Sequence, residues 1–156
     1  EAIFLQLPGV TEVISGYTGG TTPNPTYEQI CTGKTGHAEV CKIVFNPEII
    51  SYKQLLKYFW ESHDPTTLNR QGNDIGTQYR SAIFYTNETQ KEIAKTYKEK
   101  LLQSNIYKNP IVTDIEPLDT FYAAEKYHQN YYRLNKEKPY CQFVIKPKLD
   151  KIFENK

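Results

Sequence analysis

The nine residues from His37 to Phe45, HAEVCKIVF, constrain the fold most, because they read as a β-strand that is largely apolar on both faces. With a period of two, Glu39 shares one face with Cys41 and Ile43. A strand of this kind is typical of the centre of a sheet that is covered on both sides. The pattern therefore places an ionisable glutamate near the start of a buried strand, and its presence there needs an explanation.

Strand-like and helix-like segments alternate along the rest of the chain. Ser51 and Gln54 form the capping-box pattern that begins a helix over residues 51–63, and Asn87 with Gln90 caps a second helix over residues 88–103. This order predicts a single α+β domain over residues 1–156, built as a two-layer α/β sandwich with a mixed sheet. The other expected strands cover residues 10–19, 79–86 and 111–117, and the other expected helices cover residues 1–7, 123–135 and 148–155.

The charge balance and hydropathy exclude several classes of partner. Nineteen basic and 18 acidic residues give a net charge of +1, so the chain has no basic face for nucleic acid. No apolar run approaches the roughly 20 residues that cross a bilayer. The first residues, EAIFLQLPGV, lack the basic and apolar regions of a signal peptide. We therefore expect a cytoplasmic protein that binds neither nucleic acid nor a membrane.

The cysteines argue against a disulfide framework and against a zinc site. Cys31, Cys41 and Cys141 are odd in number and widely spaced, which suits a reducing compartment. Although His37 lies between the first two, the spacing matches no common zinc pattern. We expect neither a metal nor a cofactor.

Four residues are candidates for a polar pocket, each with an ordinary structural alternative. A desolvated Glu39 would have a raised pKa and could donate a proton near neutral pH, whereas a strand-end glutamate more often reaches water or pairs with a lysine. Tyr27, in a turn-rich stretch, and Tyr79, at the start of an expected strand, could equally be core tyrosines. Asp74 lies between glycines of a long polar loop over residues 64–78, where its carboxylate could simply cap turns.

Three long runs of the sequence indicate a more specific function, because together they resemble one known family. The runs GYTGGTTPNPTYEQICTGKTGHAEV, FWESHDPTTLNRQGNDIGTQYRSAIF and FYAAEKYHQNYYRLN are similar to those of the A-type peptide methionine sulfoxide reductases, in order and over nearly the whole chain. The resemblance implies a ferredoxin-like α/β sandwich and an enzyme that reduces the S epimer of methionine sulfoxide, free or in proteins. In that family a cysteine thiolate attacks the sulfoxide sulfur and is left as a sulfenic acid.

The resemblance also implies a role for each candidate. The glutamate of the family's Gly-His-Ala-Glu motif falls on Glu39, which would be the general acid that protonates the departing oxygen. Tyr27 and Tyr79 would donate hydrogen bonds to the sulfoxide oxygen. Asp74 would help to hold a water and orient the substrate.

The family's nucleophile is missing from the residues given. It lies in a Gly-Cys-Phe-Trp motif, and the glutamate that follows that motif corresponds to Glu1, so we expect the nucleophile just before Glu1. Cys31 matches a position where the family often has a non-catalytic cysteine, and Cys41 faces an apolar surface where a thiol stays inert. The alternative is a truncated pseudoenzyme that binds methionine sulfoxide without turnover. An unrelated thiol or metal-binding module is disfavoured by the cysteine spacing.

Cys141 is the candidate recycling cysteine. It matches a Tyr-Cys near the family's C-terminus, where many members form a disulfide with the sulfenic acid for thioredoxin to reduce. The family's glycine-rich tail is replaced here by QFVIKPKLDKIFENK, so an unreactive buried thiol is the alternative. We expect a monomer with thioredoxin as its reductant.

Overall fold

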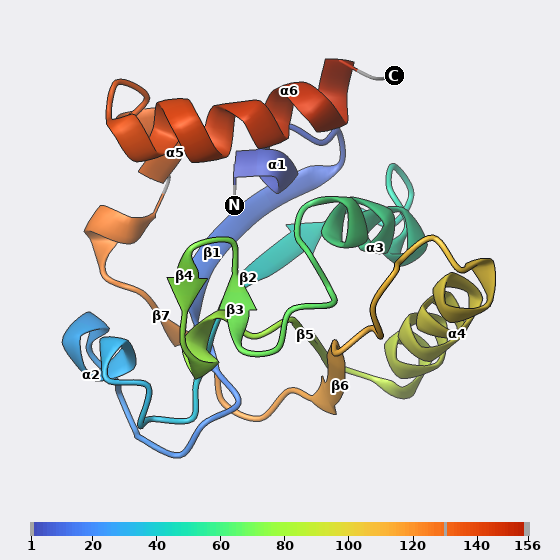
Figure 1. Ribbon diagram of the computed structural model, residues 1–156, viewed down its shortest axis with the longest axis horizontal. Helices are drawn as coiled ribbons and strands as arrows, with labels where there is room; N and C mark the ends of the chain where they lie inside the picture. The colour runs from blue at the N-terminus through green and yellow to red at the C-terminus, as the bar shows by residue number, and fades with distance from the viewer. Residues whose placement is uncertain (1, 130, 155–156) are drawn as a thin grey trace.

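The computed structural model describes residues 2–129 and 131–154, and Figure 1 shows the arrangement of their helices and strands. The helices are α1 (Ala2–Leu5), α2 (Tyr27–Cys31), α3 (Tyr52–Glu61), α4 (Glu88–Ser104), α5 (Tyr131–Leu134) and α6 (Lys146–Glu154). The strands are β1 (Val10–Thr18), β2 (Ala38–Phe45), β3 (Arg70–Gln71), β4 (Asp74–Ile75), β5 (Ala82–Tyr85), β6 (Asp114–Pro117) and β7 (Tyr122–Ala123). Short 3₁₀ turns cover Thr77–Tyr79 and Lys126–His128, and a π-helical turn covers Cys141–Ile145.

The strands form small sheets of both kinds, which confirms the mixed α+β class. β1 lies between β2 and β7 and is antiparallel to both, whereas β5 and β6 are parallel. β3 and β4 form a two-stranded hairpin inside the long polar loop. Within the described residues β2 pairs with β1 alone, so the prediction that residues 37–45 form a central strand is wrong. The apolar residues on its free side line a cavity instead of meeting another strand.

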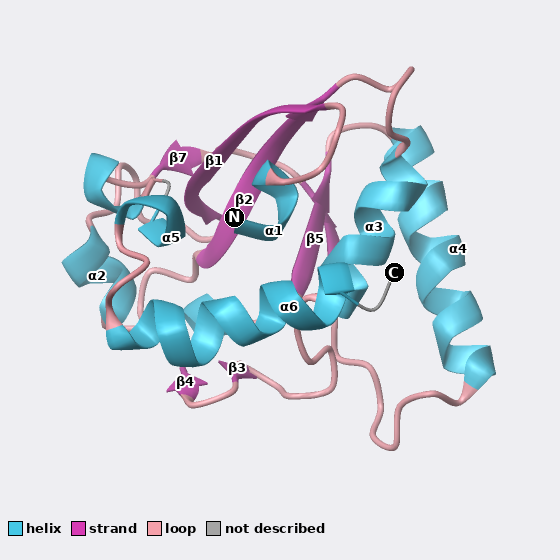
Figure 2. Cartoon of the chain, turned by 90° about the horizontal axis from the view of Figure 1, so that it is seen from above, coloured by secondary structure: helices cyan, strands magenta, loops and turns pink. Residues whose placement is uncertain are grey.

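α3 connects the two main apolar cores, and its start follows the predicted pattern. The Ser51 hydroxyl accepts from the backbone N–H of Gln54 at 3.1 Å, and the Gln54 side chain accepts from the N–H of Ser51 at 2.8 Å. Both bonds satisfy donors that the first helical turn leaves open. Leu55 packs into the core beside β1, whereas Leu56 and Trp60 pack with β5 and α4. In Figure 2, α3 and α4 lie together beside β5.

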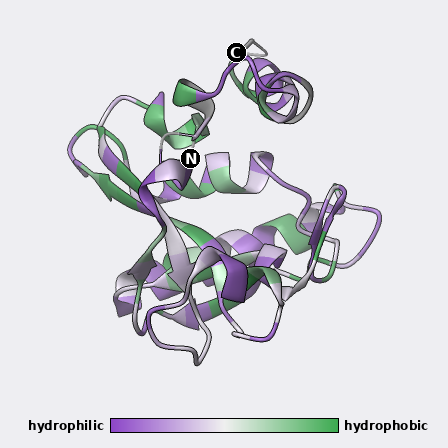
Figure 3. Ribbon diagram, turned by 90° about the vertical axis from the view of Figure 1, so that its left-hand side faces the viewer, coloured by the Kyte–Doolittle hydropathy of each residue, from purple (hydrophilic) through white to green (hydrophobic). Residues whose placement is uncertain are grey.

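α6 covers the cavity side of the molecule from the C-terminal end of the chain. Leu149 and Ile152 pack against Ile3 of α1, and Phe153 stacks on Tyr58 of α3 with 6.1 Å between ring centroids. Figure 2 shows α6 running along one side of the sheet, and Figure 3 shows that it carries both hydrophilic and hydrophobic residues around its axis. Its apolar stripe therefore joins the beginning of the chain to the end.

Three local predictions differ from the structure. Thr26 and Gln29 form a second capping box that begins α2, where a turn was expected. Tyr79 ends a 3₁₀ turn before β5 and does not open the strand. The expected helix over residues 123–135 is replaced by β7, a 3₁₀ turn and the short α5, because this segment forms hydrogen bonds with β1 along its first half. In addition, no helix of the described ranges is long and apolar enough to cross a bilayer.

Candidate active site

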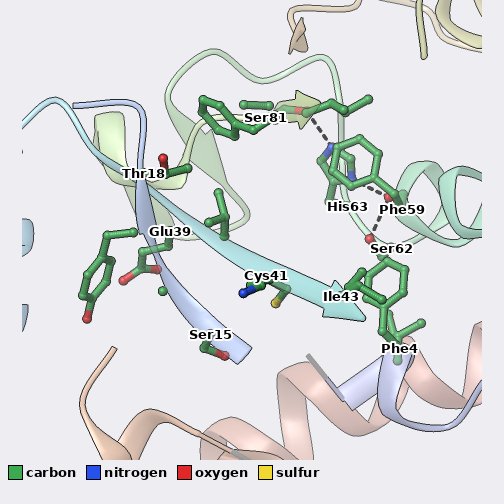
Figure 4. Close-up of a pocket in the computed structure, with 18 of the residues that line it drawn as sticks. Phe4, Ser15, Thr18, Glu39, Cys41, Ile43, Phe59, Ser62, His63 and Ser81 are labelled. Carbon is green, nitrogen blue, oxygen red and sulfur yellow. Dashed lines mark hydrogen bonds between the residues drawn. The ribbon is translucent and has the colours of Figure 1, made fainter. Parts of the chain in front are cut away.

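A cavity of about 730 Å³ lies between β2 and β5, and α6 lies over part of it. One end of the cavity is apolar, because Phe4, Ile43 and Phe59 surround the half-buried Cys41 there. Glu39 lies at the other end, and Figure 4 shows its carboxylate on the same side of β2 as Ser15 of β1. An apolar pocket with a few polar groups at one end is the usual form of a small-molecule site.

Glu39 is positioned by the pairing of β1 with β2. The register places it directly opposite Tyr17, whose side chain is buried at 2 % exposure. Glu39 itself is exposed to the cavity, so it is less enclosed than the strand pattern predicted. The protein atoms around the cavity nevertheless desolvate the carboxyl, and together with the negative charge of Asp74 they raise the pKa of Glu39 to about 7. At neutral pH a substantial fraction of this group is therefore the neutral acid.

Tyr79 and Asp74 reach the site from the long polar loop. Tyr79 is half-buried and lines the cavity, and burial, followed by the charges of Glu39 and Asp74, raises its pKa to about 12. Asp74 lies on β4 and does not line the cavity, although it is near enough to influence both groups. The loop is fastened beside α2 where the hydroxyl of Thr77 donates to the carbonyl of Gly33 at 3.1 Å. Tyr79 is therefore a neutral phenol, which can donate a hydrogen bond, throughout the ordinary pH range.

Tyr27 lies on the first turn of α2. It is half-buried and does not line the cavity. A hydrogen bond with Cys31, followed by burial and by the charges of neighbouring groups that include Tyr79 and Glu39, raises the pKa of Tyr27. The structure therefore gathers Glu39, Tyr79, Asp74 and Tyr27 in one neighbourhood, with the first two in the cavity wall itself.

A buried polar chain holds the two ends of the long loop together. His63 follows α3 and Ser81 precedes β5, and the Ser81 hydroxyl lies 2.6 Å from Nε2 of His63 (Figure 4). The other ring nitrogen of His63 lies 2.7 Å from the carbonyl of Phe59, and Ser81 lies 2.7 Å from the hydroxyl of Thr113. A carbonyl can only accept, so Nδ1 of His63 carries the proton and Nε2 accepts from Ser81. These hydrogen bonds therefore fix both ends of the loop that carries Asp74 and Tyr79.

α6 brings a positive charge to the same cavity. Lys148 lines it, and burial of the amine lowers the lysine pKa against the opposing influence of Asp74. Tyr140, just before the π-helical turn, also lines the cavity. The C-terminal segment is therefore part of the wall and not a separate appendage.

The three cysteines lie in different environments, and none is paired. Cys31 is exposed on α2, Cys41 is half-buried in the cavity wall, and Cys141 is fully buried in the π-helical turn. Neither Cys31 nor Cys141 lines the cavity. Among the described residues no group of His, Cys, Asp and Glu is arranged to hold a metal ion.

Sequence reasoning missed the residues that hold these candidates in place. Tyr17, His63, Ser81 and Glu125 each contact or face a candidate residue or its loop, yet none was singled out. The sequence did contain a signal for the helix that carries Tyr27, because Thr26 and Gln29 have the spacing of a capping box. No local signal could have linked Tyr27 with Glu125, because 98 residues separate them.

The whole chain is similar to one family of known proteins. The model of the peptide methionine sulfoxide reductase family matches residues 1–156. Two curated relatives are named peptide methionine sulfoxide reductase MsrA. The relative from Nautilia profundicola is 51 % identical over 100 % of this chain and 88 % of its own length, and that from Acinetobacter baumannii strain SDF is 55 % identical over 98 % and 86 %.

Solved structures are also similar to this chain. Methionine sulfoxide reductase A of Corynebacterium diphtheriae superposes with a TM-score of 0.76 and 39 % identity, covering 87 % of this chain and 69 % of its own. Reduced Mxr1 of Saccharomyces cerevisiae superposes with a TM-score of 0.77 and 37 % identity, covering 85 % and 76 %. The chain belongs to the peptide methionine sulfoxide reductase family.

Proposed function

We propose that Glu39 is the general acid with which this protein reduces methionine sulfoxide, the reaction of its family. The protein is a peptide-methionine (S)-S-oxide reductase, an oxidoreductase that returns methionine sulfoxide to methionine and so repairs oxidised proteins. The pseudoenzyme alternative has no support, because relatives that are more than half identical over the chain are named as reductases.

The observation that carries the assignment is the raised pKa of Glu39 in the wall of a cavity whose other end is apolar. When a thiolate attacks the sulfoxide sulfur, negative charge develops on the oxygen, and that oxygen leaves readily only if it is protonated. A carboxyl with a pKa of about 7 is both protonated and acidic enough to give its proton at neutral pH. The hydroxyl then passes to the attacking sulfur, so a sulfenic acid and methionine are the products.

Tyr79, Tyr27 and Asp74 support the same step. We assign both phenols as hydrogen-bond donors to the sulfoxide oxygen, since burial is among the causes that raise both pKa values and both tyrosines respond to the charge of Glu39. We assign Asp74 a role in keeping Glu39 protonated and in orienting the substrate through a water. Donors aimed at a developing oxyanion are usually a large part of such catalysis.

We assign the nucleophile to a cysteine in a Gly-Cys-Phe-Trp segment immediately before Glu1, within the same single catalytic domain as residues 1–156. The support is the position of α1, whose residues Ala2, Ile3 and Phe4 line the cavity that contains Glu39. Cys41 lies in the same wall but is surrounded by apolar residues, where a thiol is not activated.

The remaining parts of the proposal concern recycling and context. Cys141 would attack the sulfenic acid, releasing water and forming a disulfide that the dithiol of thioredoxin reduces. We propose a cytoplasmic monomer of the ferredoxin-like sandwich type. The support is that all three cysteines are free and that helices flank small antiparallel and parallel sheets.

A single-turnover experiment on the full-length gene product tests the acid. Glu39→Gln keeps the shape and a hydrogen-bond donor but cannot release a proton, so sulfenic acid formation should slow by roughly 10²–10⁴-fold with little change in substrate affinity. The loss should shrink in acid, where hydronium can replace the carboxyl. Glu12→Gln, an exposed strand carboxylate outside the cavity, is the matched control. A native rate for Glu39→Gln would remove Glu39 from the chemistry.

A further inference from the structure

The segment after β7, AEKYHQ (residues 124–129), lies beside β1, and the side chain of Gln129 fixes its position there. The amide of Gln129 bonds to the backbone of Ser15 in both directions: Oε1 accepts from the Ser15 N–H and Nε2 donates to the Ser15 carbonyl, each at 2.8 Å. Nε2 also donates to the carbonyl of Ala124 at 3.1 Å. Gln129 thus takes the place that a paired strand residue would have, and it holds residues 124–129 against the edge of β1.

Within that segment the Glu125 carboxylate collects donors from three parts of the chain. Oε1 accepts from the hydroxyl of Tyr17 at 3.3 Å, and Oε2 accepts from the backbone N–H of Tyr27 at 3.0 Å and from the hydroxyl of Tyr127 at 3.3 Å. A carboxylate is suited to this arrangement because it only accepts and has lone pairs for all three donors. Glu125 does not line the cavity, and both of its carboxylate oxygens already accept hydrogen bonds from the protein.

Through these bonds Glu125 joins Tyr17 to Tyr27, and both tyrosines are close to the groups of the proposed reaction. Tyr17 lies directly opposite Glu39 in the β1–β2 pair, and Tyr27 carries a hydroxyl assigned to the sulfoxide oxygen. The ring of Tyr27 also packs on His128, three residues after Glu125, with 4.5 Å between the ring centroids. Both the backbone and the ring of Tyr27 are therefore set by the segment that Gln129 holds against β1.

We propose that Glu125 is a positioning residue that sets the place of Tyr27 relative to Glu39. It links α2 to β1, because it accepts hydrogen bonds from Tyr27 and from Tyr17. The Tyr27 hydroxyl and the Glu39 carboxyl, which lie on elements that are not adjacent in sequence, would then both reach the sulfoxide oxygen. This inference rests on the proposed role of Tyr27.

A double-mutant cycle in the full-length gene product separates positioning from general stability. Sulfenic acid formation from methionine sulfoxide is measured in single turnovers for Glu125→Ala, Tyr27→Phe and the double variant. Glu125→Ala should slow the step about tenfold, which corresponds to about 1.4 kcal/mol. Added to Tyr27→Phe, it should cost about twofold or less, because a misplaced phenol and an absent one are equivalent.

Two further variants complete the test. Glu28→Ala removes an exposed carboxylate from the same helix turn and should leave the rate unchanged. Glu125→Gln keeps an acceptor for the Tyr27 N–H and should recover most of the rate. Glu125→Leu, which has a similar size and no acceptor, replaces Glu125→Ala in the cycle if the alanine variant does not fold.

The outcomes distinguish this inference from the proposed function. If Tyr27→Phe slows the step and the effect of Glu125→Ala is fully additive, Glu125 is only structural and the inference is overturned. If Tyr27→Phe reacts at the native rate, the role of Tyr27 itself is wrong and the inference is overturned with it. A non-additive cycle with recovery by Glu125→Gln supports it.

Discussion

Nε2 of His63 and the hydroxyl of Ser81 lie 2.6 Å apart and close the loop that brings Asp74 and Tyr79 to Glu39. The bond is part of a chain in which Thr113 contacts Ser81 and His63 contacts the carbonyl of Phe59. Ser81 and Thr113 are nearly fully buried, at 4 % and 1 % exposure. Each group in such a chain depends on the next, because a buried polar atom that loses its partner is not compensated by water.

Replacing Ser81 should therefore destabilise the protein more than an ordinary serine substitution. Ser81→Ala leaves His63 without its donor and should lower the free energy of unfolding by about 1–3 kcal/mol, measured by urea denaturation. Ser104→Ala is the matched control, because its exposed hydroxyl donates only to the carbonyl of Leu101 in the same helix, and should change stability by no more than about 0.5 kcal/mol. Equal effects of the two variants would contradict the importance of the chain.

The same histidine should make the protein less stable in acid. Burial is the main cause that lowers the pKa of His63, so the neutral ring is the native form; the carbonyl of Phe59 and the charge of Asp64 oppose this shift, and Lys148 adds to it. A lowered native pKa means that the unfolded state binds the proton first, so stability is present above pH 6.5 and is lost as the pH falls. His63→Asn should flatten this part of the stability profile between pH 7 and pH 5, which equilibrium unfolding at each pH would measure.

Glu39 should have the opposite effect on stability. Its native pKa is raised from 4.5 to about 7, so the native state holds the proton more tightly than the unfolded state, and stability falls as the pH rises through this interval. Glu39→Gln removes the ionisation and should be more stable than the native protein at pH 8, whereas the difference should vanish near pH 4. Unfolding curves of both proteins at the two pH values check this, with Glu12→Gln expected to show no such trend.

The proposed position of the nucleophile before Glu1 has a direct consequence for activity. Residues 1–156 alone should not reduce methionine sulfoxide with dithiothreitol, whereas a protein that extends through a Gly-Cys-Phe-Trp segment before Glu1 should do so. Turnover by residues 1–156 would place the attacking thiol among Cys31, Cys41 and Cys141, and serine replacements of each would then identify it.

The proposed recycling step requires the buried Cys141 to become accessible. In the reduced native protein, alkylation should modify the exposed Cys31 first and the fully buried Cys141 last. In the full-length enzyme, Cys141→Ser should retain one stoichiometric turnover and lose steady-state turnover with thioredoxin. Unchanged thioredoxin-dependent rates would show that Cys141 only fills space beside α6.

The sequence predicted those parts of the structure that depend on residues close together in the chain. The starts of α3 and α4 and the positions of β1 and β2 were predicted, because a cap needs residues only three apart and a strand can be recognised from a short, mostly apolar run. The resemblance to the reductases pointed to Glu39, Tyr27, Tyr79 and Asp74 as site residues, and the structure brings these together in one neighbourhood.

Only the tertiary structure decided what surrounds and holds those residues. Residues 123–135 carry a helix-like pattern, yet Gln129 bonds to Ser15, 114 residues away, and residues 122–129 lie along β1 instead. Glu125 accepts hydrogen bonds from Tyr17 and Tyr27, which are 108 and 98 residues away in the sequence. The free side of β2 faces a cavity, which the periodicity of the sequence did not predict. Local patterns report the bonds that a segment makes with itself, whereas the pKa of Glu39 and the position of Tyr27 depend on groups that meet only when distant segments pack.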